Sequence, residues 1–276
     1  MKIDLHTHSW ESDGDFAPEK VVDLAVECGV SVLALTDHDT LQGNLAARKE
    51  AVSRGICFIP GIELSCNWGK LCIHITGLKV DPEDKTLNAI CEKTLKLRGE
   101  RAVEIDRRFQ KLGITGILDL VKQMFPDVEN ISRAHFARAL IERAIVKNEQ
   151  QAFDRYLGTN APAYVPAAWV ELPEAVKLIK AAGGIPVLAH PMRYKFRTDL
   201  AREALVQDFV EAGGIGLEVT SGSQSPHYSA LCEQWVRRYG LYASTGSDFH
   251  RISKERPMIG AQTPLPEGLP CVLELF

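Results

Sequence analysis

Short apolar runs recur along the chain, and a side chain that can bind a metal ion follows each run or lies within it. Seven such runs occupy residues 2–8, 30–36, 56–62, 71–78, 185–189, 215–217 and 241–245. They are rich in β-branched residues and almost uninterrupted by polar positions, which is typical of parallel strands buried on both faces. This pattern predicts an α/β sheet whose strands end in chemically capable residues.

Helical patterns separate most of these predicted strands. Four of them occupy residues 18–28, 44–54, 173–182 and 199–212, and a glycine follows each, as at the C-terminal end of many helices. A strand, a helix and a glycine before the next strand make up a repeated β/α unit. Seven strands approach the eight of a TIM barrel, in which catalytic groups lie where the strands end.

The segment between the fourth and fifth predicted strands breaks this pattern. It contains helical patterns only, at residues 87–112, 117–125, 135–146 and 151–156, and Pro162 and Pro166 mark the return to the barrel. We therefore expect a barrel formed by residues 1–85 and 166–276, and a helical insertion at 86–165 that caps the active site.

The composition restricts the class of protein. With 45% hydrophobic and 25% charged residues, the chain suits a globular protein with a substantial core. No apolar run approaches the roughly 20 residues that span a bilayer. The N-terminus lacks the apolar segment of a signal peptide, and the seven cysteines form no CxxC pair. We expect a cytoplasmic protein with reduced thiols and no membrane association.

The charge of the chain is unevenly distributed. The net charge of −4 gives no overall signature of nucleic-acid binding. Residues 91–164 nevertheless carry 13 basic and 10 acidic residues, against 19 and 26 in the remainder. A mildly basic insertion above an acidic body suits an anion-binding segment opposite a cationic metal site. A difference of this size also arises as ordinary surface variation, and both interpretations stay open here.

A His-x-His motif at His6 and His8 lies in the first predicted strand, where alternation places both rings on one face. Such a pair alone is weak evidence for a metal site. Six of the eight histidines, however, lie at predicted strand ends or within a buried strand, and Asp13, Glu63 and Asp248 lie at equivalent places. Buried charges cost several kcal/mol unless they are neutralised, and divalent cations can neutralise such a cluster.

Nine residues are therefore candidates for both metal binding and catalysis. They are His6, His8, Asp13, His38, Glu63, His74, His190, Asp248 and His250. Nine ligands supply about three for each of three metal ions and leave positions for water and substrate. The mixture of imidazole and carboxylate without thiolate suits Mn, our first choice, or Fe or Zn. A carboxylate such as Glu63 could bridge two ions, the arrangement that commonly supports attack of water on phosphorus.

The motifs that contain these residues resemble those of the PHP (polymerase and histidinol phosphatase) family, and the resemblance covers nearly the whole chain. The matching segments are Asp4-Leu5-His6-Thr7-His8, Ser12-Asp13-Gly14, Thr36-Asp37-His38-Asp39, Gly61-Ile62-Glu63, His74, Ala189-His190-Pro191 and Gly246-Ser247-Asp248-Phe249-His250. The resemblance implies a distorted (β/α)7 TIM-like barrel with three metal ions. It assigns His6, His8, Glu63 and Asp248 to one ion, Glu63, His74 and His190 to a second, and Asp13, His38 and His250 to a third.

Within that family, the helical insertion resembles the branch that acts on nucleoside 3′,5′-bisphosphates or trims short RNA from its 5′ end. The resemblance implies substrate-phosphate ligands at Arg98, Arg101, Ser132, Arg133 and His135. Arginine forks match phosphate oxygens, and a helix predicted to begin near Ser132 offers an anion site at its N-terminus. The alternative for Arg98 and Arg101 is a solvated helix face.

The chain departs from the branch after His190-Pro191, where Met192 replaces the usual glycine and Arg193-Tyr194 follow. We expect Arg193 to contact the substrate as well. For Glu218, at the end of the sixth predicted strand, we favour a role in orienting a metal-bound histidine over a substrate contact. His227 lies in a Ser/Pro-rich segment and is expected to be a surface residue.

These observations predict a metal-dependent phosphoesterase that converts nucleoside 3′,5′-bisphosphates to 5′-monophosphates, with 5′-to-3′ cleavage of short RNA as a companion activity. The expected partners are a small nucleotide and possibly short RNA, with no obligate protein partner. One alternative is hydrolysis of histidinol phosphate, which the charged insertion disfavours because a monophosphate requires no second anion site. Another is a non-catalytic metal-binding or polymerase-accessory module.

Overall fold

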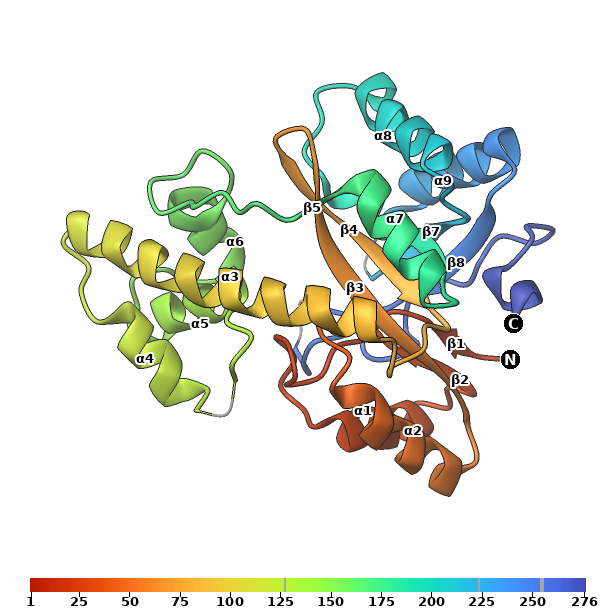
Figure 1. Cartoon of the computed structure of the whole chain (residues 1–276), viewed down its shortest axis with the longest axis horizontal. Coiled ribbons are helices and arrows are strands. Elements are labelled where there is room, and N and C mark those ends of the chain that lie inside the picture. Colours follow the sequence, from red (N-terminus) through yellow and green to blue (C-terminus); the bar gives the residue numbers. More distant parts are fainter. Residues whose placement is uncertain (127, 223, 254–255) are drawn as a thin grey trace.

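The computed structural model describes residues 1–126, 128–222, 224–253 and 256–276. A strongly twisted sheet forms one part of the molecule, and a group of helices extends from it at the end of the long helix α3 (Lys85–Lys111) (Figure 1). No helix within the described residues is long and apolar enough to cross a membrane.

Seven strands of the described chain form the path of the sheet. They are β1 (Ile3–Asp4), β2 (Val32–Leu35), β3 (Cys57–Trp68), β4 (Leu71–Leu78), β6 (Ile185–Leu188), β7 (Gly216–Ser221) and β8 (Tyr242–Gly246), in that order across the sheet. The backbone after β1 returns to the other edge, because Leu5 N donates to Thr245 O at 3.0 Å and Thr7 forms a bridge with Phe249. The sheet is therefore a nearly closed barrel, as expected.

The expectation of parallel strands throughout was wrong for β4, which is antiparallel to both β3 and β6. Trp68 pairs with Leu71, so only Gly69 and Lys70 join β3 to β4, and Gly69 has a positive φ of 58°. A two-residue hairpin leaves no room for the crossover helix that parallel neighbours require. The hairpin is the distortion that separates this barrel from a regular β/α repeat.

Helices cover the outside of the barrel. Four were expected and are present: α1 (Pro18–Glu27), α2 (Gly43–Arg54), α7 (Leu172–Ala181) and α8 (Asp199–Glu211). A fifth, α9 (Pro226–Tyr239), was not predicted, because its Ser/Pro-rich beginning is also typical of a loop. Pro226 occupies the first turn, where a missing N–H is tolerated, and Cys232, Trp235 and Val236 pack into the barrel core. His227 is exposed in the first turn of α9.

The helices α3, α4 (Ile117–Met124), α5 (Arg133–Glu142) and α6 (Glu149–Ala152) form the group on the left of Figure 1, and α6 continues into a π-helical turn (Phe153–Leu157). They enclose a hydrophobic cluster of their own, in which Phe109 and Phe136 stack. The chain then passes through β5 (Val170–Glu171), a short strand paired with β3 that was not predicted. Two 3-10 turns, Pro191–Arg193 and Val272–Leu275, complete the described elements.

Candidate metal centre and active site

The alternation of β3 and β4 sorts their side chains into two sets. Ile62, Leu64 and Cys66 of β3 pack in the barrel's principal core with Ile73 and Ile75 of β4. The intervening residues of the two strands pair across the hairpin, with Glu63 opposite Thr76 and Ser65 opposite His74. Because side chains alternate along a strand, Glu63 and His74 share the face that the apolar residues leave. The alternation along β3 and β4 therefore places Glu63 and His74 side by side at the centre of the site.

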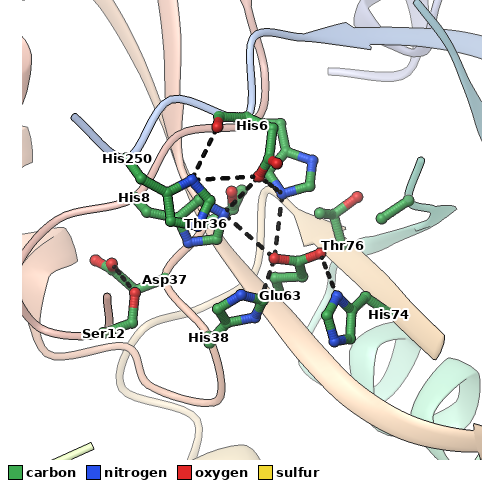
Figure 2. A network of polar contacts seen from close by, with 12 residues as sticks. His6, His8, Ser12, Thr36, Asp37, His38, Glu63, His74, Thr76 and His250 are labelled. Carbon is green, nitrogen blue, oxygen red and sulfur yellow. Dashed lines mark hydrogen bonds and ion pairs between the residues drawn. The ribbon is translucent and has the colours of Figure 1, made fainter. Parts of the chain in front are cut away.

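All nine predicted metal ligands gather at this face, which lies beyond the ends of the parallel strands. β1 ends at Asp4, so His6 and His8 follow the first strand and do not lie within it as predicted. Thr7 between them still pairs with Phe249, and the two ring centroids lie 5.1 Å apart. His38 follows β2, His190 follows β6, and the last two ligands follow β8. Figure 2 shows the rings of His6, His8, His38, His74 and His250 around the carboxylate of Glu63.

Glu63 is the hub of the cluster, because its two oxygens meet different histidines. Oε1 lies 3.0 Å from His74 Nδ1 and 2.9 Å from His190 Nε2. Oε2 lies 3.2 Å from His6 Nε2, 3.3 Å from His8 Nε2 and 3.0 Å from His38 Nδ1. Each oxygen of Glu63 therefore faces a different set of histidines, as expected of a carboxylate that could serve two metal ions.

Three groups of side chains among the described residues place their ligand atoms within 4.8 Å of one another. They are His6, His8, Glu63 and Asp248; His8, Asp13, His38 and His250; and His38, Glu63 and His74. The first group equals one ligand set implied by the family resemblance, and the second contains another. His8, His38 and Glu63 each fall in two groups and His190 falls in none, so the division of ligands among ions remains a prediction.

Buried ligand atoms without hydrogen-bond partners test whether these residues fit metal ions. They include His6 Nε2, Asp13 Oδ1, His38 Nδ1, Glu63 Oε2 and His74 Nδ1. Buried polar atoms are nearly always paired in folded proteins, so several orphans that converge on one place require another partner. Nitrogen and carboxylate oxygen are ligands of divalent transition metals. The cluster therefore fits divalent metal ions.

The pKa values show how strongly the cluster attracts positive charge. Burial opposes protonation of His8 and His74. At His8 the hydrogen bonds with Asp248 and Glu63 outweigh burial and raise the pKa to about 9, and at His74 the charge of Glu63 outweighs it and raises the pKa to about 10. For His38 burial prevails and lowers the pKa to about 3. Burial alone would raise the pKa of Glu63, yet the surrounding histidines hold it well below its usual range. Metal ions would take the place of the protons that this cluster otherwise binds.

Carboxylates behind the cluster orient its ligands. Glu218 Oε2 lies 2.9 Å from His6 Nδ1 and accepts a hydrogen bond from His190 N at 3.2 Å, so Glu218 contacts two predicted ligands from behind. Such a contact fixes the tautomer and direction of a metal-binding imidazole. Asp37 accepts bonds from Ser9 N, Ser9 Oγ and Ser12 Oγ at 2.6–2.7 Å, which hold the loop that carries Asp13.

No role was predicted for Asp37 or Asp4, although both lie within the segments that resemble the family motifs. Asp4 is buried and accepts hydrogen bonds from Ser247 N at 2.9 Å and Gly260 N at 2.7 Å, so it ties β1 to the loop that bears Asp248. Burial raises the pKa of Asp4 to about 6. A carboxylate inside an otherwise apolar strand was the available signal for this role, because it must find partners.

Six non-glycine residues of the described chain have a positive φ, and three of them belong to the site or contact it: Asp39, His190 and Asp248, with φ of 54°, 30° and 53°. Non-glycine residues pay a conformational cost in this region, and such strain concentrates at functional sites. Asp248 N donates to His6 O at 2.9 Å, so a barrel-closing hydrogen bond helps to hold one of these conformations.

A cavity of about 410 Å³ opens over the cluster. Its walls include Asp13, His38, His74, His190, Asp248 and His250 together with Arg98, Arg101, Ser132, Arg133 and Arg193. The insertion and the barrel therefore contribute to one cavity. Five of the six predicted substrate-binding residues, all but His135, therefore line the same space as six of the nine predicted metal ligands.

Arg98 and Arg101 of α3 do not lie on a solvated helix face, so the alternative considered for these two residues was wrong. Arg98 is 5% exposed, and its guanidinium binds Asp39 and, at 3.0 Å, Ser65 Oγ. Arg101 Nε donates to Val165 O at 2.8 Å, and its guanidinium lies over the ring of Trp169. Arg98 is thus paired with a carboxylate, whereas the contacts of Arg101 within the described residues are a carbonyl and the rings of Tyr164 and Trp169.

The insertion also places residues from the N-terminus of α5 near the cavity. Ser132 Oγ accepts a hydrogen bond from Ala134 N at 3.0 Å and donates to Asp13 Oδ2 at 3.1 Å. Arg133 NH1 donates to Leu157 O at 3.2 Å. His135 is not among the residues that line the cavity; it is buried, and its Nδ1 accepts the hydrogen bond of Ser132 N at 2.9 Å, which completes a capping box.

Arg193 lines the cavity and its guanidinium binds Asp248. Several other residues of the cavity wall were not predicted from the sequence, among them Tyr194, Arg251, Arg256 and Glu149. Tyr194 Oη accepts a hydrogen bond from His74 N at 2.8 Å and donates to Ala189 O at 3.2 Å, so it joins β4 to the loop of His190. The only sequence feature that could have pointed to Tyr194 is its position two residues after Met192, where the chain departs from the family pattern.

Comparisons with known proteins agree with this geometry. The PHP domain model matches residues 4–97. A protein from Chromobacterium violaceum named 3′,5′-nucleoside bisphosphate phosphatase is 41% identical over 264 residues, which cover 96% of this chain and 92% of that protein. The chain belongs to the PHP family. The family and fold expected from the sequence are thereby confirmed.

Two further matches extend over most of the chain. A 5′-3′ exoribonuclease from Haemophilus influenzae is 41% identical over 249 residues, 90% of each chain. A solved structure of an amidohydrolase from Chromobacterium violaceum, with bound sulfate and no metal, superposes with a TM-score of 0.94 and 39% identity. It covers 100% of this chain and 95% of the solved chain, so the insertion is shared as well as the PHP barrel.

Proposed function

We propose that this PHP-family phosphoesterase hydrolyses the 3′-phosphate of nucleoside 3′,5′-bisphosphates to give 5′-monophosphates, and that it also removes 5′ nucleotides from short RNA. One observation carries the proposal: Arg101 and Arg133 line the same cavity as the metal ligands, and neither forms an ion pair with a carboxylate within the described chain. Two unneutralised guanidinium groups beside a phosphoryl-transfer centre suit a substrate with a second phosphate.

The electrostatics of Arg101 support this role. Burial, with the charges of Arg133 and Arg98 in second place, lowers the pKa of Arg101 to about 9. The guanidinium remains cationic at neutral pH, but its surroundings oppose the charge. A terminal phosphate with about two negative charges would relieve that opposition. The name of one relative, 3′,5′-nucleoside bisphosphate phosphatase, describes a substrate with two such phosphates.

The metal requirement follows from the donor set. We propose three divalent ions with Mn as the preferred metal, held by the nine residues predicted from the sequence. When bound, these ions supply Lewis-acid stabilisation of the phosphoryl oxygens and lower the pKa of a coordinated water. Glu63 would join two of the ion sites through its separate oxygens, and Glu218 would hold His6 in the tautomer that leaves Nε2 free to bind.

Each remaining residue has a positional task in this proposal. Arg101 and Arg133 would bind the 5′-phosphate, so that the ester at the 3′ position lies at the cluster. Ser132 would hold Asp13 through its hydroxyl while its own backbone N–H is bound by His135. Asp37 and Asp4 would maintain the loops that carry Asp13 and Asp248. Binding energy at the 5′-phosphate would thus be used to place the ester that reacts.

A substrate panel tests the proposal. Purified protein with Mn²⁺ should be assayed against adenosine 3′,5′-bisphosphate, histidinol phosphate and a 5′-phosphorylated tetraribonucleotide. We expect kcat/KM for the bisphosphate to exceed that for histidinol phosphate by at least about tenfold, because the latter cannot use a second anion site. Equal or better turnover of histidinol phosphate would overturn the proposal. Glu63→Gln, treated identically, excludes a contaminating phosphatase.

A further inference from the structure

Two arginines beyond the last metal ligand line the cavity and share one carboxylate. Arg251 NH2 lies 2.6 Å from Glu149 Oε1, and Arg256 NH2 lies 3.3 Å from Glu149 Oε2. Glu149 begins α6 of the insertion, whereas both arginines belong to the segment after β8. We call these three residues the Glu149 triad. Its side chains are partly accessible, at 15% for Glu149, 21% for Arg251 and 33% for Arg256.

The balance of charge sets the triad apart from the other arginines of the cavity. Arg98 and Arg193 each have a carboxylate partner, Asp39 and Asp248 respectively. Arg101 and Arg133 have none among the described residues and suit a terminal phosphate with about two negative charges. The triad has two guanidinium groups and one carboxylate, which leaves one positive charge. A phosphodiester carries one negative charge, so the excess matches an internal phosphate of a nucleic acid.

The triad lies next to the predicted metal centre, where the substrate would react. Arg256 NH1 lies 3.3 Å from Nδ1 of His250, a predicted metal ligand. Arg101 and Arg133 instead donate to carbonyls within the insertion, those of Val165 and Leu157 respectively. The cavity therefore contains two cationic groups of different origin on its wall, in addition to the metal cluster. A bisphosphate has only two phosphates, one for the cluster and one for Arg101 and Arg133.

We propose that the Glu149 triad binds the phosphodiester on the 3′ side of the scissile phosphate, and so determines how well the enzyme uses oligonucleotides relative to nucleoside bisphosphates. The inference rests on the proposed function, because it presumes that the 5′-phosphate occupies Arg101 and Arg133. Glu149 keeps the two arginines in place and competes with the phosphodiester for them. Loss of an arginine and loss of the carboxylate should therefore have opposite effects.

The first test replaces Arg251, which does not contact a metal ligand. Arg251→Gln should raise KM for a 5′-phosphorylated tetraribonucleotide by at least about tenfold, the cost of a lost charged hydrogen bond. KM for adenosine 3′,5′-bisphosphate should change less than about twofold. The slope of log KM against log salt for the tetranucleotide should fall by about 0.7, the loss of one phosphate contact on a single strand. Arg237→Gln, an exposed arginine paired with Glu233 on α9, is the matched control.

The second test replaces the carboxylate. Glu149→Gln should lower KM for the tetranucleotide, because the phosphodiester no longer competes with a negative charge. If the triad only tethers the insertion to the barrel, Glu149→Gln and Arg251→Gln will both impair the two substrates to a similar extent, and the inference is wrong. It is also wrong if Arg251→Gln leaves the tetranucleotide unaffected. Failure of the wild-type protein to hydrolyse the bisphosphate would instead defeat the proposed function.

Discussion

The hydroxyl of Ser132, at the N-cap of α5, donates a hydrogen bond to Asp13 Oδ2 at 3.1 Å. This contact joins the helical insertion directly to a predicted metal ligand of the barrel. The same oxygen accepts a bond from Ala134 N at 3.0 Å, so one side chain both caps a helix and positions a carboxylate. The fold of the insertion and the geometry of the metal centre are therefore linked at this serine.

Replacement of Ser132 should affect stability and activity together. Ser132→Ala removes the cap and should lower the free energy of unfolding by about 0.5–2 kcal/mol, measured by urea denaturation. It should also weaken the metal-dependent activity, because Asp13 Oδ2 loses a donor. Ser132→Thr keeps the hydroxyl and should retain most of both. A variant that loses stability but keeps full metal affinity would show that the bond to Asp13 is incidental.

Removal of the central carboxylate should abolish the cluster. Glu63→Gln should weaken Mn²⁺ binding by more than about 100-fold, since even residues behind metal ligands commonly contribute 10–100-fold. Isothermal titration with Mn²⁺ and metal content after dialysis measure this loss. Glu218→Gln, which contacts His6 from behind, should give the smaller 10–100-fold effect. Equal effects of the two substitutions would argue against Glu63 as a shared ligand.

The metal ligands could be predicted because their signals are local. The His-x-His spacing places His6 and His8 together in the segment after β1, where Thr7 pairs with Phe249. The ends of parallel strands meet at one edge of a barrel, so residues distant in sequence converge. The antiparallel β4 could have been anticipated from Gly69 at a two-residue turn, but apolar runs alone do not give strand direction. His74 nevertheless reaches the cluster, because its alternation within β4 is unaffected by that direction.

Other features depend on tertiary contacts that leave no local pattern. Whether Arg98 is solvated or buried depends on Asp39, a partner from a different loop. The link from Glu149 to Arg251 joins the insertion to the last loop of the barrel, and both residues are of types that usually lie on solvated surfaces. Helix α9 was missed for a different reason: Ser225-Pro226 begins helices and loops alike.

The predicted phosphate clamp can be tested at Arg133. Arg133→Ala should raise KM for adenosine 3′,5′-bisphosphate by about 10–100-fold, the range for a lost hydrogen bond to a charged group. KM for 4-nitrophenyl phosphate should change little, because this ester has no second phosphate. Arg107→Ala, on an exposed position of α3, is the control. Similar losses with both substrates would mean that Arg133 supports the fold of the insertion.

The capping box of α5 should make the insertion sensitive to acid. Burial lowers the pKa of His135 to about 4, although the charge of Asp13 opposes this shift. In the unfolded chain the pKa of a histidine is about 6.5, so between pH 6.5 and 4 the unfolded state binds the additional proton. Stability that is present above pH 6.5 is therefore lost as the pH falls through this window. Protonation of Nδ1 also removes the acceptor for Ser132 N.

His135→Gln isolates this contribution, because glutamine at the same position completes a capping box without titrating. Thermal unfolding of metal-free protein should be followed between pH 7.5 and 4.5 for the wild type and the variant. The melting temperature of the wild type should fall more steeply below pH 6.5 than that of His135→Gln. His227→Gln, which changes an exposed histidine of α9, should follow the wild type. Parallel curves for wild type and His135→Gln would show that the cap does not control the acid sensitivity of the insertion.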